Sequence, residues 1–467
     1  MADNQKDVFK VLSDLEKRVL GINDDPKLVK PTPTGFIVSF LPTALTITKE
    51  NYENPWSPGI NDDDQQLTTK RQDSLVNLCE LVDKKLMLDG SGQSVPSSTK
   101  ISETWRIIVE GANALPSAMK EATEITKAVD EANKLLFVID AEGNIVDDSP
   151  AYKKYQECSD TYDNALTTLS NEYNKAYDDK RKFQQWPITG KPFKNAVYTA
   201  LDKWNSVGKR SKIESAISFL SAQGIDVAAK LISLSKKRLE DNKIVLANNE
   251  YFYTRVRPSD WCDPENVEGW TEYTYSKSIQ NDVETTSSRK WSGSAGFWLW
   301  KASASSSKET SSLISSTESL KITFNYALIS IDRLFMTTLL PNLSGWFLKG
   351  GKKGCISTGK PVQEIPSDET GWLPAIPTTM IAVKNVTITS DEIKKNIEEI
   401  KTAFSGSGGG GWGIFSGRGS YSKADGSKKT GIEVTNEGIV IHGTQVIGWI
   451  SEILPECPKV TDPALGS

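Results

Sequence analysis

Residues 287–319 read SSRKWSGSAGFWLWKASASSSKETSSLISSTES, an aromatic block set inside a long run of serine, threonine, glycine and alanine. On an extended strand, successive side chains point to opposite faces. Trp298 and Trp300 would then share one face, and Phe297 and Leu299 would share the other. This pattern predicts an amphipathic β-hairpin with an apolar tip.

A related pattern returns near the end of the chain, where residues 404–423 read FSGSGGGGWGIFSGRGSYSK. Both stretches open with an aromatic residue and Ser-Gly-Ser, pass through glycine to an apolar block, and close on Ser-x-Ser-Lys. We therefore expect 287–319 and 404–442 to occupy equivalent places in one β-rich domain. The predicted contact residues of the two hairpins are Trp291, Phe297, Trp298, Leu299, Trp300, Trp412, Ile414 and Phe415.

The C-terminal half has the composition of a β-rich domain, since it holds nine of the chain's 13 tryptophans among many Tyr, Thr, Ser and Val residues. Strands are expected at 251–257, 270–286, 296–307, 320–332, 378–389, 412–422 and 431–442. A helix over 390–404 interrupts them, with Ser390 as its N-cap. Two β-branched pieces near the N-terminus, 36–40 and 44–48, are candidates to join the same domain.

Residues 101–248 have a helical pattern almost throughout. Ser149 and Pro150 suit the N-cap and first position of a long helix over 150–186. A seven-residue repeat of Tyr155, Tyr162, Leu169 and Ala176 along that helix predicts side-by-side packing in an antiparallel bundle. Further helices are expected at 192–206, 210–222 and 225–247, and a small hairpin within 135–148.

The predicted fold class is α+β, with an elongated and mostly helical N-terminal half followed by an antiparallel β-rich C-terminal domain with two related Gly/Ser/Trp hairpins. A chain of 467 residues is long enough for two or three domains. We predict a helix, an extended arm and a second helix over 1–98, the helical bundle over 99–248, and the β-rich domain over 249–467.

No motif in the chain predicts a catalytic, cofactor or metal site. The only histidine, His442, lies in an alternating run, where a hydrogen-bonded structural role is the usual one. The GxGxxG pattern at 406–411 follows a predicted helix and precedes a strand, the reverse of a dinucleotide site. Residues 354–361 resemble a phosphate-binding loop, but Pro361 replaces the magnesium-binding Ser or Thr. The acidic clusters at 62–64 and 147–148 are expected to be solvated.

The composition of the chain limits the kinds of binding partner and the cellular compartment that we expect. A net charge of −5 provides no basic face for nucleic acid. Five widely spaced cysteines are typical of reduced thiols. The N-terminus lacks an apolar signal-peptide region, and no run approaches the length of a membrane helix. We expect a protein made in the cytoplasm. If it acts outside the cell, it leaves by a non-classical route or by lysis.

These observations favour a non-enzymatic protein that forms homo-oligomers. Ser/Thr-rich amphipathic strands with an apolar tip resemble, in composition alone, the insertion hairpins of β-barrel pore-forming toxins, which implies a lipid membrane as a partner. The alternative is a structural subunit of a filament, sheath or shell that uses the same hairpins as contacts between subunits. A third idea is that exposed tryptophans stack on the rings of a glycan.

Overall fold

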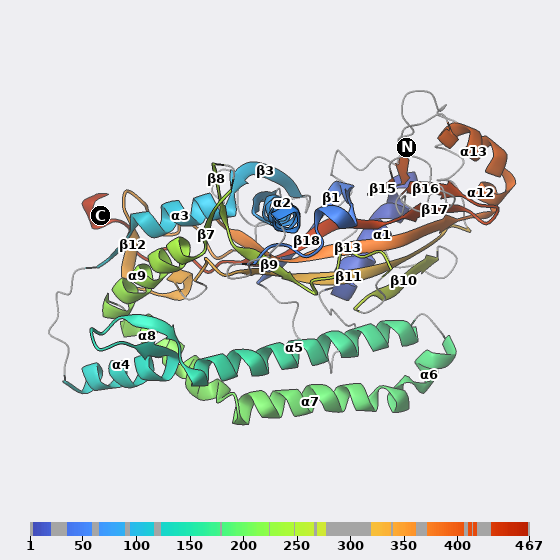
Figure 1. The fold of residues 1–467 in the computed structure, drawn as a ribbon. Coiled ribbons are helices and arrows are strands. Elements are labelled where there is room, and N and C mark those ends of the chain that lie inside the picture. The colour runs from blue at the N-terminus through green and yellow to red at the C-terminus, as the bar shows by residue number, and fades with distance from the viewer. Residues whose placement is uncertain are drawn as a thin grey trace.

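The computed structural model combines helices, mostly within residues 10–241, with a large curled antiparallel sheet (Figure 1). It describes residues 3–19, 35–57, 65–88, 94–115, 123–177, 180–223, 225–246, 248–265, 269–276, 319–337, 340–360, 371–405, 410–412, 414–417 and 431–465. The predicted mixture of α and β structure is confirmed. The sheet is not confined to the C-terminal half, because its first strand comes from near the N-terminus.

The main sheet has eight strands, and all of its pairs are antiparallel. Its central path runs in the order β1 (Phe36–Ile47), β18 (Thr444–Ile453), β13 (Ala375–Thr389), β11 (Lys321–Arg333) and β10 (Thr271–Ser276). Off this path, β9 (Thr254–Arg257) pairs with β11, and β17 (Ile439–His442) pairs with both β13 and β16 (Gly431–Val434). The β1–β18 pairing confirms that the 36–48 segment joins the sheet.

Apolar side chains cover both faces of the sheet. Along β11, Ile322, Phe324 and Tyr326 share a core with the helix α1 (Asp3–Val19). Ile329 and Ile331 point the other way and pack with α2 (Gln65–Val82). This alternation follows from the two-residue period of a strand. A sheet buried on both faces explains why β18 is almost continuously apolar or small, and why its burial does not alternate.

The helical region contains α3 (Ile101–Gly111), α4 (Thr123–Leu136), α5 (Pro150–Tyr177), α6 (Lys180–Thr189), α7 (Lys191–Ser206), α8 (Arg210–Gln223) and α9 (Ile225–Asp241). As predicted, its longest helix begins after Ser149, whose hydroxyl accepts a hydrogen bond from the backbone N–H of Tyr152 at 3.0 Å. The predicted hairpin within 135–148 is also present, as β5 (Phe137–Ile139) and β6 (Ile145–Asp148). The last helix ends earlier than predicted, where β7 (Lys243–Leu246) pairs with β8 (Asn249–Phe252).

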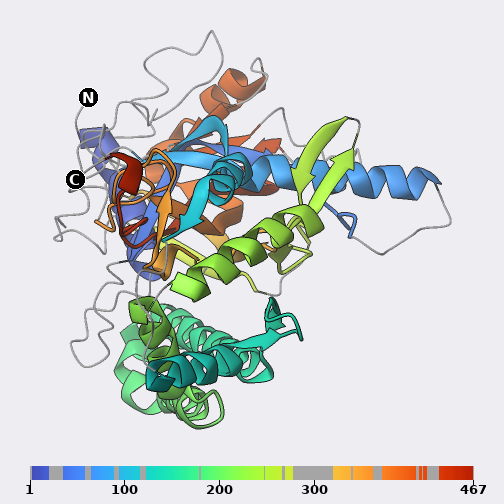
Figure 2. The ribbon, with the colours of Figure 1, turned by 90° about the vertical axis from the view of Figure 1, so that its left-hand side faces the viewer.

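Helices α5, α6 and α7, which we call the helical arm, project beside the sheet (Figures 1 and 2). Their shared core contains Leu169, Ala176, Trp186 and Val197, with further aromatic residues around it. The repeat read from the sequence therefore does pack one helix of the arm against the others. At the opposite end of the molecule, α3 and α9 share a core with residues from 335 to 356, so that one core spans the predicted boundary at 248/249.

The remaining strands form small separate pairs. The strand β4 (Ala112–Ala114) pairs with β12 (Trp346–Leu348), which ties the helical half to the C-terminal half near α3. The strands β2 (Lys84–Leu88) and β3 (Ser94–Lys100) form a hairpin between α2 and α3. None of these pairs was expected, because each strand is short and carries little periodicity.

Candidate functional site

One end of the main sheet carries the attachment points of residues 277–320, which include the serine-rich stretch 287–319. The last pair of β10 and β11 is Ser276 with Lys321, and Lys321 also pairs with Thr389 at the end of β13. Both attachment points of the 277–320 segment therefore lie side by side at this end. The predicted contact residues Trp291, Phe297, Trp298, Leu299 and Trp300 belong to this segment and fall outside the described residues.

The same end of the sheet also leads into the second stretch. The backbone N–H of Asp391 donates a hydrogen bond to the Ser319 hydroxyl at 3.0 Å. Asp391 opens α12 (Asp391–Lys395), and the Ser390 hydroxyl caps this helix by accepting from Ile393 at 3.1 Å. The helix predicted over 390–404 is thus present, but Asn396 divides it from α13 (Ile397–Ser405). The contact between Ser319 and Asp391 ties the end of the first stretch to the helices that precede the second.

The second stretch forms the predicted hairpin in miniature. Its strands are β14 (Gly410–Trp412) and β15 (Phe415–Gly417), with Trp412 opposite Phe415. Ile414 and Phe415 are 1% and 2% exposed, and the Phe415 ring lies 5.3 Å from that of Phe324 in the sheet. The apolar surface of these two predicted contact residues is therefore already covered within one chain.

Polar contacts fix this hairpin against β1 and β18. The Ala44 N–H donates to the Ile414 carbonyl at 2.7 Å, and the Ser416 hydroxyl donates to the Ala44 carbonyl at 3.0 Å. The Ser416 N–H donates to Oε1 of the buried Gln445 at 3.0 Å. Sequence reasoning missed Ala44 and Gln445 as anchors, and the only signal was one amide side chain in the apolar run of β18.

Charged pairs surround this end of the sheet. The Lys394 ammonium bonds the Glu437 carboxylate at 2.6 Å and lowers the pKa of that carboxyl. On β17 and β16, the half-buried His442 hydrogen-bonds Glu433 at 2.8 Å. The hydrogen bond expected for the only histidine is present.

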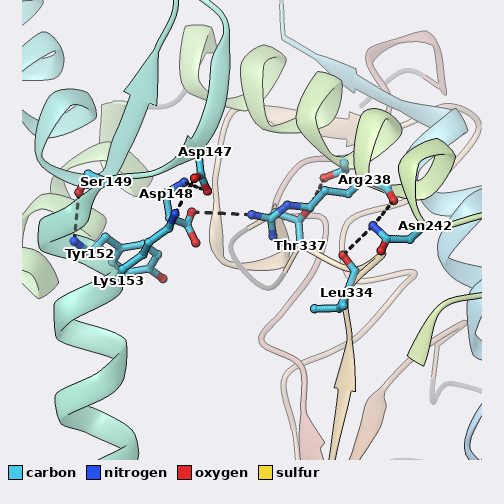
Figure 3. A network of polar contacts seen from close by, with 10 residues as sticks. Asp147, Asp148, Ser149, Tyr152, Lys153, Arg238, Asn242, Leu334 and Thr337 are labelled. Atoms are coloured by element: carbon cyan, nitrogen blue, oxygen red, sulfur yellow. Dashed lines mark hydrogen bonds and ion pairs between the residues drawn. The ribbon is translucent and has the colours of Figure 1, made fainter. Parts of the chain in front are cut away.

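A second polar network lies at the base of the helical arm (Figure 3). Asp147 pairs with Lys153, and Asp148 lies 3.8 Å from Arg238 of α9. Burial raises the pKa of Asp148, and the Arg238 charge opposes that rise. The Asn242 amide donates to the Leu334 carbonyl at 3.4 Å, which links α9 to the end of β11. The acidic pair 147–148 is therefore engaged with cations of the protein itself.

Residues 354–360 of the loop that resembles a phosphate-binding loop are described, and their glycines have a structural role. The Gly354 N–H donates to the Pro458 carbonyl at 2.8 Å. A side chain at Gly359, which has a φ of 73°, would lie 2.6 Å from the Glu456 backbone nitrogen. These glycines let the loop pack closely against the C-terminal segment. Pro361 and residues 406–409 of the other glycine pattern, like the acidic cluster at 62–64, fall outside the described residues.

Comparison with known proteins gives no relative: no family model, no curated protein and no solved structure matches this chain. No helix in the described part of the chain is long and apolar enough to cross a membrane. Within the same residues, no group of three or more His, Cys, Asp or Glu side chains is placed to hold a metal ion.

Proposed function

We propose that this protein acts by self-association rather than by catalysis, through the Gly/Ser/Thr/Trp segments attached at this end of the sheet. One observation carries the proposal. The attachment points of the 277–320 segment, Ser276 and Lys321, are paired, and Ser319 bonds to the helix that leads into the second stretch. The first segment is therefore attached next to the helices that precede the second stretch, whose Ile414 and Phe415 pack onto the sheet.

Paired attachment points suit a segment that extends as a hairpin. Because β10 and β11 are already antiparallel, a hairpin formed by the segment between them would keep the direction of both strands. Each half of that segment has about 20 residues, and at about 3.3 Å per residue it reaches about 65 Å. A membrane-spanning strand needs only about ten residues. The segment is therefore long enough to cross a bilayer or to reach a neighbouring subunit.

A pore-forming, toxin-like activity is the first form of the proposal. The Ser/Thr-rich flanks of 287–319 extend well beyond the length of an ordinary hairpin. Such strands satisfy their backbone groups in a bilayer only once several copies close into a barrel. The alternative form is a structural subunit, in which the extended strands pair with a neighbouring copy and the membrane plays no part.

The experiment replaces Trp298 and Trp300 together with Ser and measures folding and assembly separately. We expect a folded monomer that no longer assembles or permeabilises liposomes. Trp372→Ser is the matched control, because Trp372 is 44% exposed and lies outside the two stretches. Unfolding of the double variant, or its assembly at the wild-type level, would refute the proposed contact role of these tryptophans.

A further inference from the structure

The helical arm lies along the sheet and contacts it through polar groups. The Tyr326 hydroxyl of β11 donates to Oδ1 of Asn171 at 3.4 Å. Toward the other end of the same strand, burial raises the pKa of Asp160, the charge of Arg257 opposes that rise and the charge of Asp332 adds to it. Helix α5 therefore runs antiparallel to β11 over this length, as Figure 1 shows.

The side of α5 that faces the sheet is polar. Asp160, Asn164, Thr167 and Asn171 follow one another at spacings of four, three and four, which places them on one helical face. The first three of these are exposed. Opposite them on β11, Ser330 is exposed as well. The helix and the strand therefore face each other with polar side chains, which is unlike the usual packing of an apolar helix face on a sheet.

The apolar side of α5 points away from the sheet. It contributes Tyr162, Leu166, Leu169 and Tyr173 to a core made only by α5, α6 and α7. Among the described residues, the core on the facing side of the sheet contains none from the arm, although α1 also approaches α5. Burial of apolar surface is the main source of docking energy. Beyond the first turns of α5, which pack in the core that contains α3 and α9, the arm has a core of its own and gains little of that energy from the sheet.

From these observations we propose that the helical arm is a displaceable cover over the β11 side of the sheet, held there by the hydrogen bond between Tyr326 and Asn171. The arm pivots at its base, near Trp204, and we call this pivot the elbow. Because the arm can separate within a single chain, this inference stands apart from the proposed self-association.

The elbow has the features of a pivot. The Trp204 ring of α7 lies 5.5 Å from both Tyr155, which packs against the core that contains α3 and α9, and Tyr162, which packs against the core of the arm. Helix α7, which runs back toward the base of the arm, ends at Ser206. A side chain at Gly208 would lie 2.6 Å from the Trp204 carbonyl. Below the elbow, the network in Figure 3 holds the base to α9. A bend of about 15° would move the tip of α5, about 28 Å away, by about 7 Å.

The test measures the distance between two spin labels by pulsed electron paramagnetic resonance. Thr168→Cys on the arm and Glu272→Cys on β10 carry the labels, since both residues are exposed. Cys355→Ser removes the one native cysteine that is not buried. We expect two label-to-label distances, one short and one long. The ratio of the long-distance to the short-distance population should increase about two- to fivefold in Asn171→Ala and in Arg257→Ala, as for the loss of one partly exposed polar contact.

Two matched controls keep the test specific. Thr161→Ala alters an exposed α5 residue whose hydroxyl bonds only within its own helix. Arg255→Ala removes the other arginine that pairs with Asp332. Unlike Arg257, Arg255 has no comparable effect on the pKa of Asp160. Circular dichroism confirms that each variant is folded. A single distance that neither variant shifts, or controls that shift it equally, would overturn the proposal.

Discussion

At the scale of single residues, Lys384 shows how a charged side chain fits inside this sheet. It lies on the central strand β13 and is buried, with its ammonium 4.4 Å from the Trp270 ring centre. The same group donates a hydrogen bond to the Pro264 carbonyl at 3.1 Å. The next residue, Asn385, has a φ of 54°, and the pairing register with β11 shifts there. The cation is stabilised by a carbonyl and an aromatic ring.

Replacing Lys384 with Met gives a pH-dependent prediction. Burial lowers the pKa of Lys384 in the folded protein below its ordinary value of 10.5. Between these two values the folded protein binds fewer protons than the unfolded one, so the contribution of Lys384 to the unfolding free energy rises with pH. Any advantage of Lys384→Met should therefore shrink as the pH approaches about 10.5. Urea unfolding of both proteins across this range checks the slope, and a difference independent of pH would contradict it.

At the scale of elements, features fixed by local sequence could be predicted. The caps Ser149 and Ser390 and the repeat along α5 depend on residues within a few turns of each other. Contacts between distant parts of the chain could not be predicted from the sequence. The burial of Ile414 depends on Ala44, and the docking of the arm depends on Tyr326, far from Asn171 in sequence. No periodicity in one segment indicates its distant partner.

The separate core of the arm predicts a local response to Leu169→Asp. Leu169 is 8% exposed in that core, so the substitution buries an unpaired charge and should destabilise the arm by about 3 kcal/mol or more. Hydrogen exchange should rise sharply in the arm and stay near wild type in β11 and β13. Thr168→Asp is the control, because that neighbouring side chain is exposed. Equal loss of protection in arm and sheet would show that the two share one core.

At the scale of the whole molecule, the two ends of the sheet differ in character. One end is closed by the core that joins α3 and α9 to the C-terminal segment. The other holds the attachment points of the Gly/Ser/Trp segments, with Lys321 paired to Ser276 and Thr389. The arm lies beside the sheet between these ends (Figure 1). The attachment of the Gly/Ser/Trp segments at one end of the molecule is compatible with the proposed self-association.

Size-exclusion chromatography with light scattering, with and without phosphatidylcholine liposomes, tests this self-association most directly. We predict a monomer in solution, with a mass near 51.4 kDa, and defined oligomers once liposomes are present. Oligomers that form equally well without lipid would replace the pore with the structural subunit, and would retain self-association. A protein that stays monomeric under both conditions, at concentrations where it is fully folded, would contradict the central claim.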